Sequence, residues 1–168
     1  FRDSKIRDEE GNLLVVYHGT TEDFTVFDRT KGRNTADIQG MFFSPWELDA
    51  IGYGLNVKAY YLNITNPASE SMGYKAFRKF AGQNNAGVKA REYLESLGYD
   101  GVNNGNEEYI AFHPEQIKLV SNESPTQSED IRYSERDFPI DSTIAGIVNA
   151  ATNSTKDKMN NLSTITVG

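Results

Sequence analysis

His18 is the histidine whose position suggests a ligand site. It directly follows the apolar run 13–17 and precedes Gly19 and Thr20. A histidine placed there could present a ring nitrogen to a ligand, and the glycine would allow the backbone to approach that ligand closely. Taken alone, the position favours a histidine at the end of a strand that is satisfied by local hydrogen bonds. The other histidine, His113, precedes a proline and is typical of a loop.

Two aromatic residues and a pair of acids are the other candidates for chemistry. Phe42 lies on a predicted strand and Tyr53 near the end of the helix predicted to follow it, so their rings could enclose a flat heteroaromatic ligand. Packing in the core is the competing interpretation. Glu107 and Glu108 are the first residues of the otherwise apolar segment 107–112. Either they are the solvent-exposed end of a strand, or one of them is a carboxylate placed to act on a ligand. Each pattern is weak by itself.

The composition excludes several classes of site and partner. The chain contains no cysteine, so it has no disulfide and no thiol nucleophile. Its two histidines lack the spacing of metal ligands, and we expect no metal. A formal net charge of −7 at pH 7 argues against a general binder of the nucleic-acid backbone. No apolar run approaches the ~20 residues that span a bilayer, so we expect no membrane partner. Because the chain does not begin with Met, we expect a segment of a longer protein.

The candidate residues lie among short predicted strands and helices. Apolar runs that end at Gly, Asn or Pro predict strands at 13–17, 40–43, 57–64, 99–102, 109–112 and 117–120. Helices are predicted at 45–53, 74–80 and 87–97. Ser44 is the expected N-cap of the first helix, with Pro45 in its first turn. The polar segment 28–40 is expected to be a loop, and the mixture of elements indicates an α+β fold.

Taken together, the candidates occur in the order of a known family. The segments VVYHGT, FFSPWELDAIGYG and EEYIAFHPEQIK contain His18, the pair Phe42 and Tyr53, and Glu108. The set resembles the His-Tyr-Glu branch of the ADP-ribosyltransferases, which includes diphtheria toxin and the poly(ADP-ribose) polymerases. With YYLNITNP, LGYDGV and DIRYSERD, it is more closely similar to the ADP-ribosyltransferase domain of phage-type polyvalent proteins, which is often joined to a phage head-morphogenesis (MuF-like) module. The resemblance covers about residues 4–137.

The resemblance implies a split β-sandwich that binds NAD in a cleft between its two sheets. In that fold Gly19 would hold the nicotinamide carboxamide through its backbone N–H and C=O groups. His18 would contact the ribose on the adenine side, and Thr20 would support the turn. Phe42 and Tyr53 would enclose the nicotinamide ring.

The resemblance also implies that Glu108 hydrogen-bonds the 2′-hydroxyl of the nicotinamide ribose and, with His18, forms the catalytic set. As neutral nicotinamide leaves, the ribose becomes oxocarbenium-like, and a fixed carboxylate favours that positive charge without reorganising. By strand alternation Glu108 shares a face with Ile110 and Phe112, whereas Glu107 does not. The family's glutamate precedes a Tyr-Ile pair, which selects Glu108.

Three positions bear on how far the family's properties carry over. The branch usually has Tyr at the position of Phe42, and some relatives have a Ser that bonds the carboxamide at the position of Ala50. Each lost hydrogen bond should weaken NAD binding by about 1 kcal/mol, and both losses leave open a catalytically inactive protein. The residue two before the glutamate helps to select the acceptor, and with Asn106 there arginine is not especially indicated.

We therefore expect an NAD-dependent mono-ADP-ribosyltransferase whose acceptor is macromolecular, a protein rather than a nucleic acid, in the cytoplasm of a bacterial host. It would arrive with a phage or mobile element as an effector or toxin domain, with an immunity protein or a fused phage module as partner. The alternatives are a catalytically inactive NAD- or peptide-binding module of a structural phage protein, and a tRNA 2′-phosphotransferase-like enzyme, which the acidic composition disfavours. Residues 1–137 would form the domain, and residues 138–168 a weakly structured tail or linker.

Overall fold

The computed structural model describes residues 1–31, 38–105, 107–122, 125–126 and 128–132. The expected C-terminal tail at 138–168, Asn106 and the middle of the expected loop 28–40 lie outside the described residues. No described helix is both long and apolar enough to cross a membrane.

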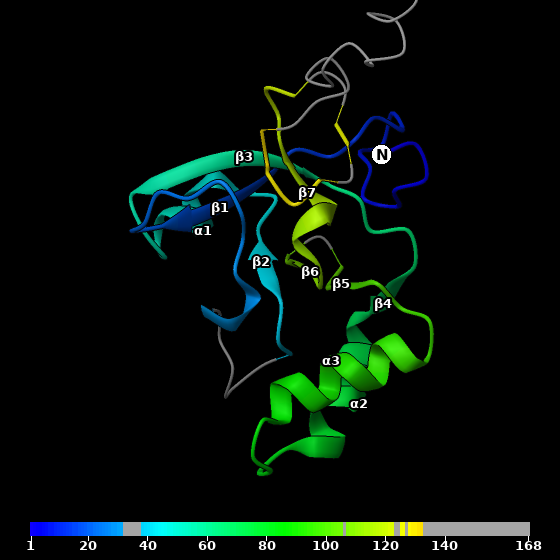
Figure 1. Ribbon diagram of the computed structural model, residues 1–168. Helices are drawn as coiled ribbons and strands as arrows, with labels where there is room; N and C mark the ends of the chain where they lie inside the picture. Colours follow the sequence, from blue (N-terminus) through cyan, green and yellow to red (C-terminus); the bar gives the residue numbers. More distant parts are fainter. Residues whose placement is uncertain (32–37, 106, 123–124, 127, 133–168) are drawn as a thin grey trace, which may run out of the picture. The chain divides into compact units, whose positions relative to one another are not determined.

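The described part of the chain contains seven short strands, three α-helices and two 3-10 helices (Figure 1). The strands are β1 (Val16–Thr20), β2 (Met41–Phe43), β3 (Asn56–Leu62), β4 (Pro67–Ser69), β5 (Gly101–Asn103), β6 (Tyr109–Ala111) and β7 (Ile117–Leu119). The α-helices are α1 (Glu47–Ile51), α2 (Glu70–Phe80) and α3 (Ala86–Ser96), and the 3-10 helices are Arg29–Lys31 and Pro114–Gln116. The protein is therefore a mixed α and β structure.

The strands form two sheets. The first has three strands in the order β1-β3-β7, and both of its strand pairs are antiparallel. The second has four strands in the order β2-β6-β5-β4, with only the β4–β5 pair parallel. In its register Phe42 lies opposite Ile110, and Phe43 lies opposite Tyr109. This register decides which side chains of β2 and β6 share a face.

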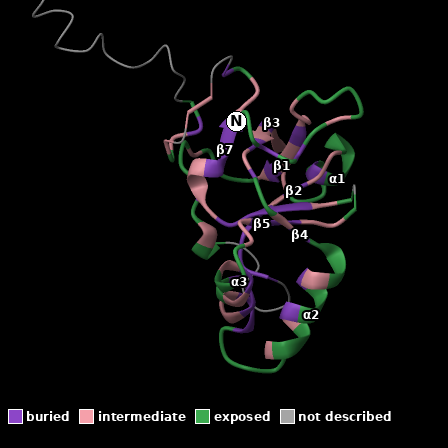
Figure 2. Cartoon of the chain, turned by 90° about the vertical axis from the view of Figure 1, so that its right-hand side faces the viewer, coloured by how far each residue is buried: buried purple, intermediate pink, exposed green. Residues whose placement is uncertain are grey.

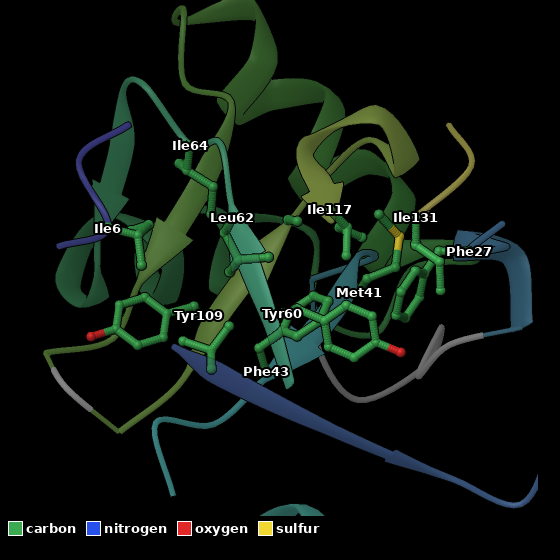
Figure 3. Close-up of a cluster of buried hydrophobic side chains, with 12 residues drawn as sticks. Ile6, Phe27, Met41, Phe43, Tyr60, Leu62, Ile64, Tyr109, Ile117 and Ile131 are labelled. Atoms are coloured by element: carbon green, nitrogen blue, oxygen red, sulfur yellow. The ribbon is translucent and has the colours of Figure 1, made fainter. Parts of the chain in front are cut away.

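Apolar side chains from both sheets fill the space between them, as Figure 3 shows. In β2 the inward residues are Met41 and Phe43, and in β6 they are Tyr109 and Ala111, because side chains alternate along a strand. Burial of this cluster away from water is the main stabilising contribution to the packing of the two sheets. The cluster comprises Ile6, Val16, Phe27, Met41, Phe43, Tyr60, Leu62, Ile64, Tyr109, Ala111, Ile117 and Ile131.

Helices α2 and α3 pack on the other face of the four-stranded sheet. Ala76 of α2 and Leu94 of α3 are buried in one cluster with Val102 and Ile110 of the sheet. Gly73 allows α2 to approach closely, because a Cβ there would lie 3.3 Å from the Val102 side chain. Both helices carry exposed residues on their outer sides (Figure 2).

Gln116 joins three segments through a fully used side-chain amide. Its Oε1 accepts hydrogen bonds from the N–H groups of Phe112 and His113 at 2.9 and 2.8 Å. Its Nε2 donates to the carbonyl oxygens of Asn63 and Asp100 at 3.2 and 2.8 Å. The ends of β3 and β6 and the start of β5 are held together by this one side chain.

Lys118 on β7 anchors the last described segment. Its side chain is 0% exposed, and Nζ donates to the carbonyl oxygens of Ser128 and, at 2.8 Å, Asp130. Burial lowers the pKa of Lys118 to about 8, although the nearby Asp130 carboxylate partly opposes this shift. Ile131 then enters the core and donates from its N–H to the Thr25 carbonyl at 2.8 Å.

Most expected strands and helices form, with differences at their ends. β1 begins three residues later than expected, so His18 lies at the centre of the strand rather than at its end. The expectation that Ser44 caps the first helix is wrong, because α1 begins at Glu47 and the Ser44 hydroxyl accepts from the Trp46 N–H at 3.0 Å. The sequence pattern misses β4, whose Pro67 occupies the first position of an edge strand, where a missing N–H costs no ladder bond.

Candidate active site

One cavity gathers the six residues that the sequence motifs single out. Its volume is about 1070 Å³, slightly above the ~300–1,000 Å³ range typical of ligand sites. Its walls come from β1, β2, α1 with the turn that follows it, and the loop between β5 and β6. The six residues are His18, Gly19, Thr20, Phe42, Tyr53 and Glu108.

The cavity lies where β1 and β2 separate. Tyr17 and Ser44 form a reciprocal backbone pair, with N···O distances of 2.7 Å from Tyr17 to Ser44 and 3.0 Å in the opposite direction. If this ladder continued, Gly19 would be the next residue to exchange hydrogen bonds, with Phe42. The Phe42 carbonyl oxygen instead lies 2.7 Å from Nδ1 of His18. The imidazole ring therefore takes the place of the next rung.

Gly19 consequently presents an N–H and a C=O group to the cavity. Alternate residues of an antiparallel strand direct their backbone groups to the same side, so those of Gly19 point, like those of Tyr17, away from β3. No residue in the described part of the chain forms a backbone hydrogen bond with Gly19 at this edge. A ligand with a donor and an acceptor side by side could pair with both groups. One residue further on, the Thr20 hydroxyl accepts from the Glu22 N–H at 3.0 Å and fixes the turn.

The surroundings of His18 favour its neutral form. The rings of Phe24, Phe27 and Phe43 surround it at centroid distances of 6.3, 5.0 and 5.4 Å. Burial lowers the pKa of His18 below its usual value, and the hydrogen bond to the Phe42 carbonyl opposes this only in part. Because a carbonyl oxygen can only accept, Nδ1 carries the proton and Nε2 is left as an acceptor. The ring is thus suited to receive a hydrogen bond from a ligand hydroxyl.

Two glycines allow α1 and the turn after it to lie close against β1, because neither has a Cβ atom. A Cβ on Gly19 would overlap the Ala50 carbonyl oxygen and lie 2.7 Å from its carbon. A Cβ on Gly54 would lie 2.7 Å from Cα of Thr20. The small size of Gly19 is therefore required by α1, while its backbone groups face the cavity. The turn after α1 contains Tyr53, which is 58% exposed and lines the cavity.

Phe42 and Glu108 belong to the helix-facing side of the four-stranded sheet. Phe42 is half-buried and packs against the cluster that contains Ile110, its partner in the register. Tyr109 faces the core between the sheets and Ile110 faces the helices, and Glu108 directly precedes this strand. Continued alternation would put Glu108 on the side of Ile110. Glu108 is half-buried whereas Glu107 is exposed, and both line the cavity.

Asn104 supports Glu108, although the sequence pattern does not single it out. The Asn104 N–H donates to the Glu108 carbonyl at 2.9 Å, and its side-chain Nδ2 donates to Glu108 Oε1 at 3.3 Å. The second bond restricts the orientation of the carboxylate. Gly105 follows with a φ of 66°. The Asn-Gly pair, which is typical of tight turns between strands, is the signal that could have identified Asn104.

The described lining of the cavity is strongly acidic. Its carboxylates are Glu22, Asp28, Asp49, Glu70, Glu107 and Glu108. Lys31 is the single lysine or arginine in this described lining, and its Nζ lies 3.1 Å from Oε2 of Glu22. Among the described residues, no three His, Asp or Glu side chains are grouped so that they could hold a metal ion.

Comparisons with known proteins identify the family. No curated protein sequence matches the chain. One solved structure, titled "Crystal structure of an anti-CRISPR protein", is 14% identical over 61% of this chain and 90% of that chain, with a TM-score of 0.38. The family model described as "ADP-Ribosyltransferase in polyvalent proteins" matches residues 8–127, which is more than two thirds of the 168 residues. The chain therefore belongs to the family of ADP-ribosyltransferase domains of polyvalent proteins.

Proposed function

We propose that this chain is an NAD-dependent mono-ADP-ribosyltransferase that transfers ADP-ribose from NAD to a macromolecular acceptor and releases nicotinamide. The observation that carries the proposal is the split between β1 and β2. At this point the open backbone groups of Gly19, two aromatic rings and the carboxylate of Glu108 line the same cavity. The family supplies the general reaction class.

In the proposed complex each group of the cavity meets one part of NAD. The carboxamide of nicotinamide donates to the Gly19 carbonyl and accepts from its N–H, while Phe42 and Tyr53 enclose the ring. His18 accepts a hydrogen bond through Nε2 from a hydroxyl of the adenine-side ribose. Lys31, the single lysine or arginine of the described lining, is the cation that we assign to the diphosphate.

The proposed chemistry depends on the position of Glu108. Nicotinamide leaves with the electron pair of its bond to C1′, and positive charge develops on the ribose. Glu108, restrained by Asn104, would hydrogen-bond the 2′-hydroxyl and favour that charge in the transition state. The acceptor then bonds to C1′ from the face that nicotinamide does not occupy. The neutral state of His18 keeps its Nε2 available for the ribose across neutral pH.

Glu108→Gln and Glu107→Gln form a matched pair that tests this assignment. Both replace a carboxylate with a nearly isosteric amide at neighbouring positions of the same cavity. We expect Glu108→Gln to bind NAD but to lose nicotinamide release by about 100-fold or more, the scale of removing one preorganised electrostatic group. Glu107→Gln should lose far less. If Glu108→Gln keeps full activity and Glu107→Gln loses it, Glu107 is the catalytic carboxylate and our assignment is wrong. Full activity of both variants would refute the mechanism.

The main alternative is a catalytically inactive module that binds NAD or a peptide. It predicts that the parent protein binds one of these ligands and releases no nicotinamide. We further propose that the domain acts in the cytoplasm of a bacterial host after delivery with a phage or mobile element, since the family is that of polyvalent proteins. Mass spectrometry of host lysate incubated with labelled NAD would identify the acceptor.

A further inference from the structure

A second cavity adjoins the first one on the helix side of the four-stranded sheet. Its volume is about 460 Å³, within the ~300–1,000 Å³ range of ligand sites. Glu70 at the start of α2 and Asn104 line both cavities. The two cavities are therefore neighbours that share part of one wall.

The second cavity lies close to the carboxylate that we assign to the reaction. Ile110, which lines it, is two residues along the chain from Glu108, and two residues of a strand span about 7 Å. Asn104, in the shared wall, donates to Glu108 Oε1 at 3.3 Å. A side chain held in this cavity could therefore reach a sugar carbon beside Glu108.

The lining of the second cavity suits a cation with an aliphatic stem. Tyr74 and Phe77 stand three residues apart on α2, and Glu70 precedes Tyr74 by four, so all three lie on one side of the helix. Tyr74 is 64% exposed. Aromatic faces attract cations and pack against methylene groups. No lysine or arginine belongs to the described lining, so a phosphate backbone would find no counter-charge there.

We propose that the second cavity is the acceptor subsite and that the acceptor is a cationic side chain, lysine or arginine, of a target protein. This inference rests on the proposed function. The C1′–nicotinamide bond breaks with its electron pair going to nicotinamide. The acceptor nitrogen loses one proton, and the lone pair so freed forms the new bond to C1′. Glu70, in the wall of both cavities, is the carboxylate placed to take that proton.

The experiment measures two products from the same reaction mixture. The full chain is incubated with NAD and one of two peptides of equal length, in which the nucleophilic side chains are either Lys and Arg or Ser and Glu. Nicotinamide release reports cleavage of NAD, and mass spectrometry reports transfer to the peptide. We expect transfer to the Lys/Arg peptide, and a fall of about tenfold in the ratio of transfer to release for Tyr74→Ala. Glu70→Gln should lower the same ratio.

Matched variants distinguish a specific effect on the second cavity from a general loss of folding or activity. Tyr74→Phe keeps the ring and should stay within twofold of the parent ratio. Leu97→Ala removes an exposed apolar side chain outside both cavities, and should leave both products unchanged. If nicotinamide is released but the Lys/Arg peptide is not the preferred acceptor, the acceptor class is wrong. An unchanged ratio in both Tyr74→Ala and Glu70→Gln overturns the subsite. A parent protein that releases no nicotinamide refutes the proposed function itself.

Discussion

Substitution of Gly19 by alanine should destabilise the protein through α1 rather than through the cavity. The added Cβ would overlap the carbonyl oxygen of Ala50 and lie 2.7 Å from the carbonyl carbon. Both partners are backbone, so no side-chain rotation can relieve the overlap, and α1 must move away from β1. Overpacking of this kind costs about 1–3 kcal/mol, and a clash between two backbones belongs at the upper end. A loss of ~3 kcal/mol in a domain of this size lowers Tm by roughly 10 °C.

Gly52→Ala is the matched control, because it adds the same methyl group at the end of α1, the helix that Gly19 of β1 approaches. A Cβ on Gly52 would meet only the Asp49 carbonyl oxygen, at 3.2 Å, and the φ of −61° is one that alanine adopts readily. We expect its Tm to stay within about 2 °C of the parent. Thermal unfolding by circular dichroism measures both variants. If the Tm of Gly19→Ala equals that of Gly52→Ala, the close approach of α1 to β1 does not require a glycine at position 19.

Three further predictions follow from the site and the core. Tyr53→Ala should raise the dissociation constant for NAD by about 10- to 100-fold, since stacking on a base-like ring contributes ~1–3 kcal/mol; calorimetric titration that shows parent-like affinity would contradict the ring pair. Burial lowers the pKa of Lys118 to about 8, so from pH 8 to 9.5 the unfolded chain binds more protons and the free energy of unfolding should rise by about 1–2 kcal/mol. Urea unfolding measures that rise, and Lys118→Met should abolish it. Truncation after Asp137 should leave a folded domain that binds NAD. Truncation before Ile131, which is 1% exposed, should unfold the domain. If the chain that lacks Ile131 is soluble and melts cooperatively, this second expectation is wrong.

Apolar runs and the family resemblance account for what the sequence could predict about the site. Glu108 precedes a strand in which Tyr109 and Ile110 face opposite sides. Residues 109–112 are all apolar, so their types do not show this alternation, and it is the family resemblance that selects Glu108 over Glu107. The same holds for Phe42, which lies between the equally apolar Met41 and Phe43, and only the structure shows that these two neighbours enter the core between the sheets. Each motif carries its own local pattern, so the short strands could be located before their partners were known.

What the sequence could not predict depends on contacts between distant segments. Ser44 has the spacing of a helix cap, but its backbone is paired with Tyr17, and this pairing holds it outside the helix. Glu70 lies at the start of a helix, where no periodic pattern marks it. It joins the site because folding brings the start of α2 to the wall of the cavity that Glu108 also lines. Gln116 is buried and hydrogen-bonds residues of three separate segments. The sequence shows only a polar residue at this position, because those segments become neighbours only when the chain folds.

The interruption of the ladder between β1 and β2 gives the protein its own reporter of ligand occupancy. The Tyr17 amide is bonded to Ser44 and should exchange its hydrogen with water slowly whether or not the site is filled. The Gly19 amide, two residues away on the same edge, has no such bond to any residue that the structure describes and should exchange rapidly in the free protein. A ligand that completes the missing rung would slow exchange at Gly19 and leave Tyr17 unaffected. One glycine resonance in an amide NMR spectrum would then follow binding at the split without any label on the ligand.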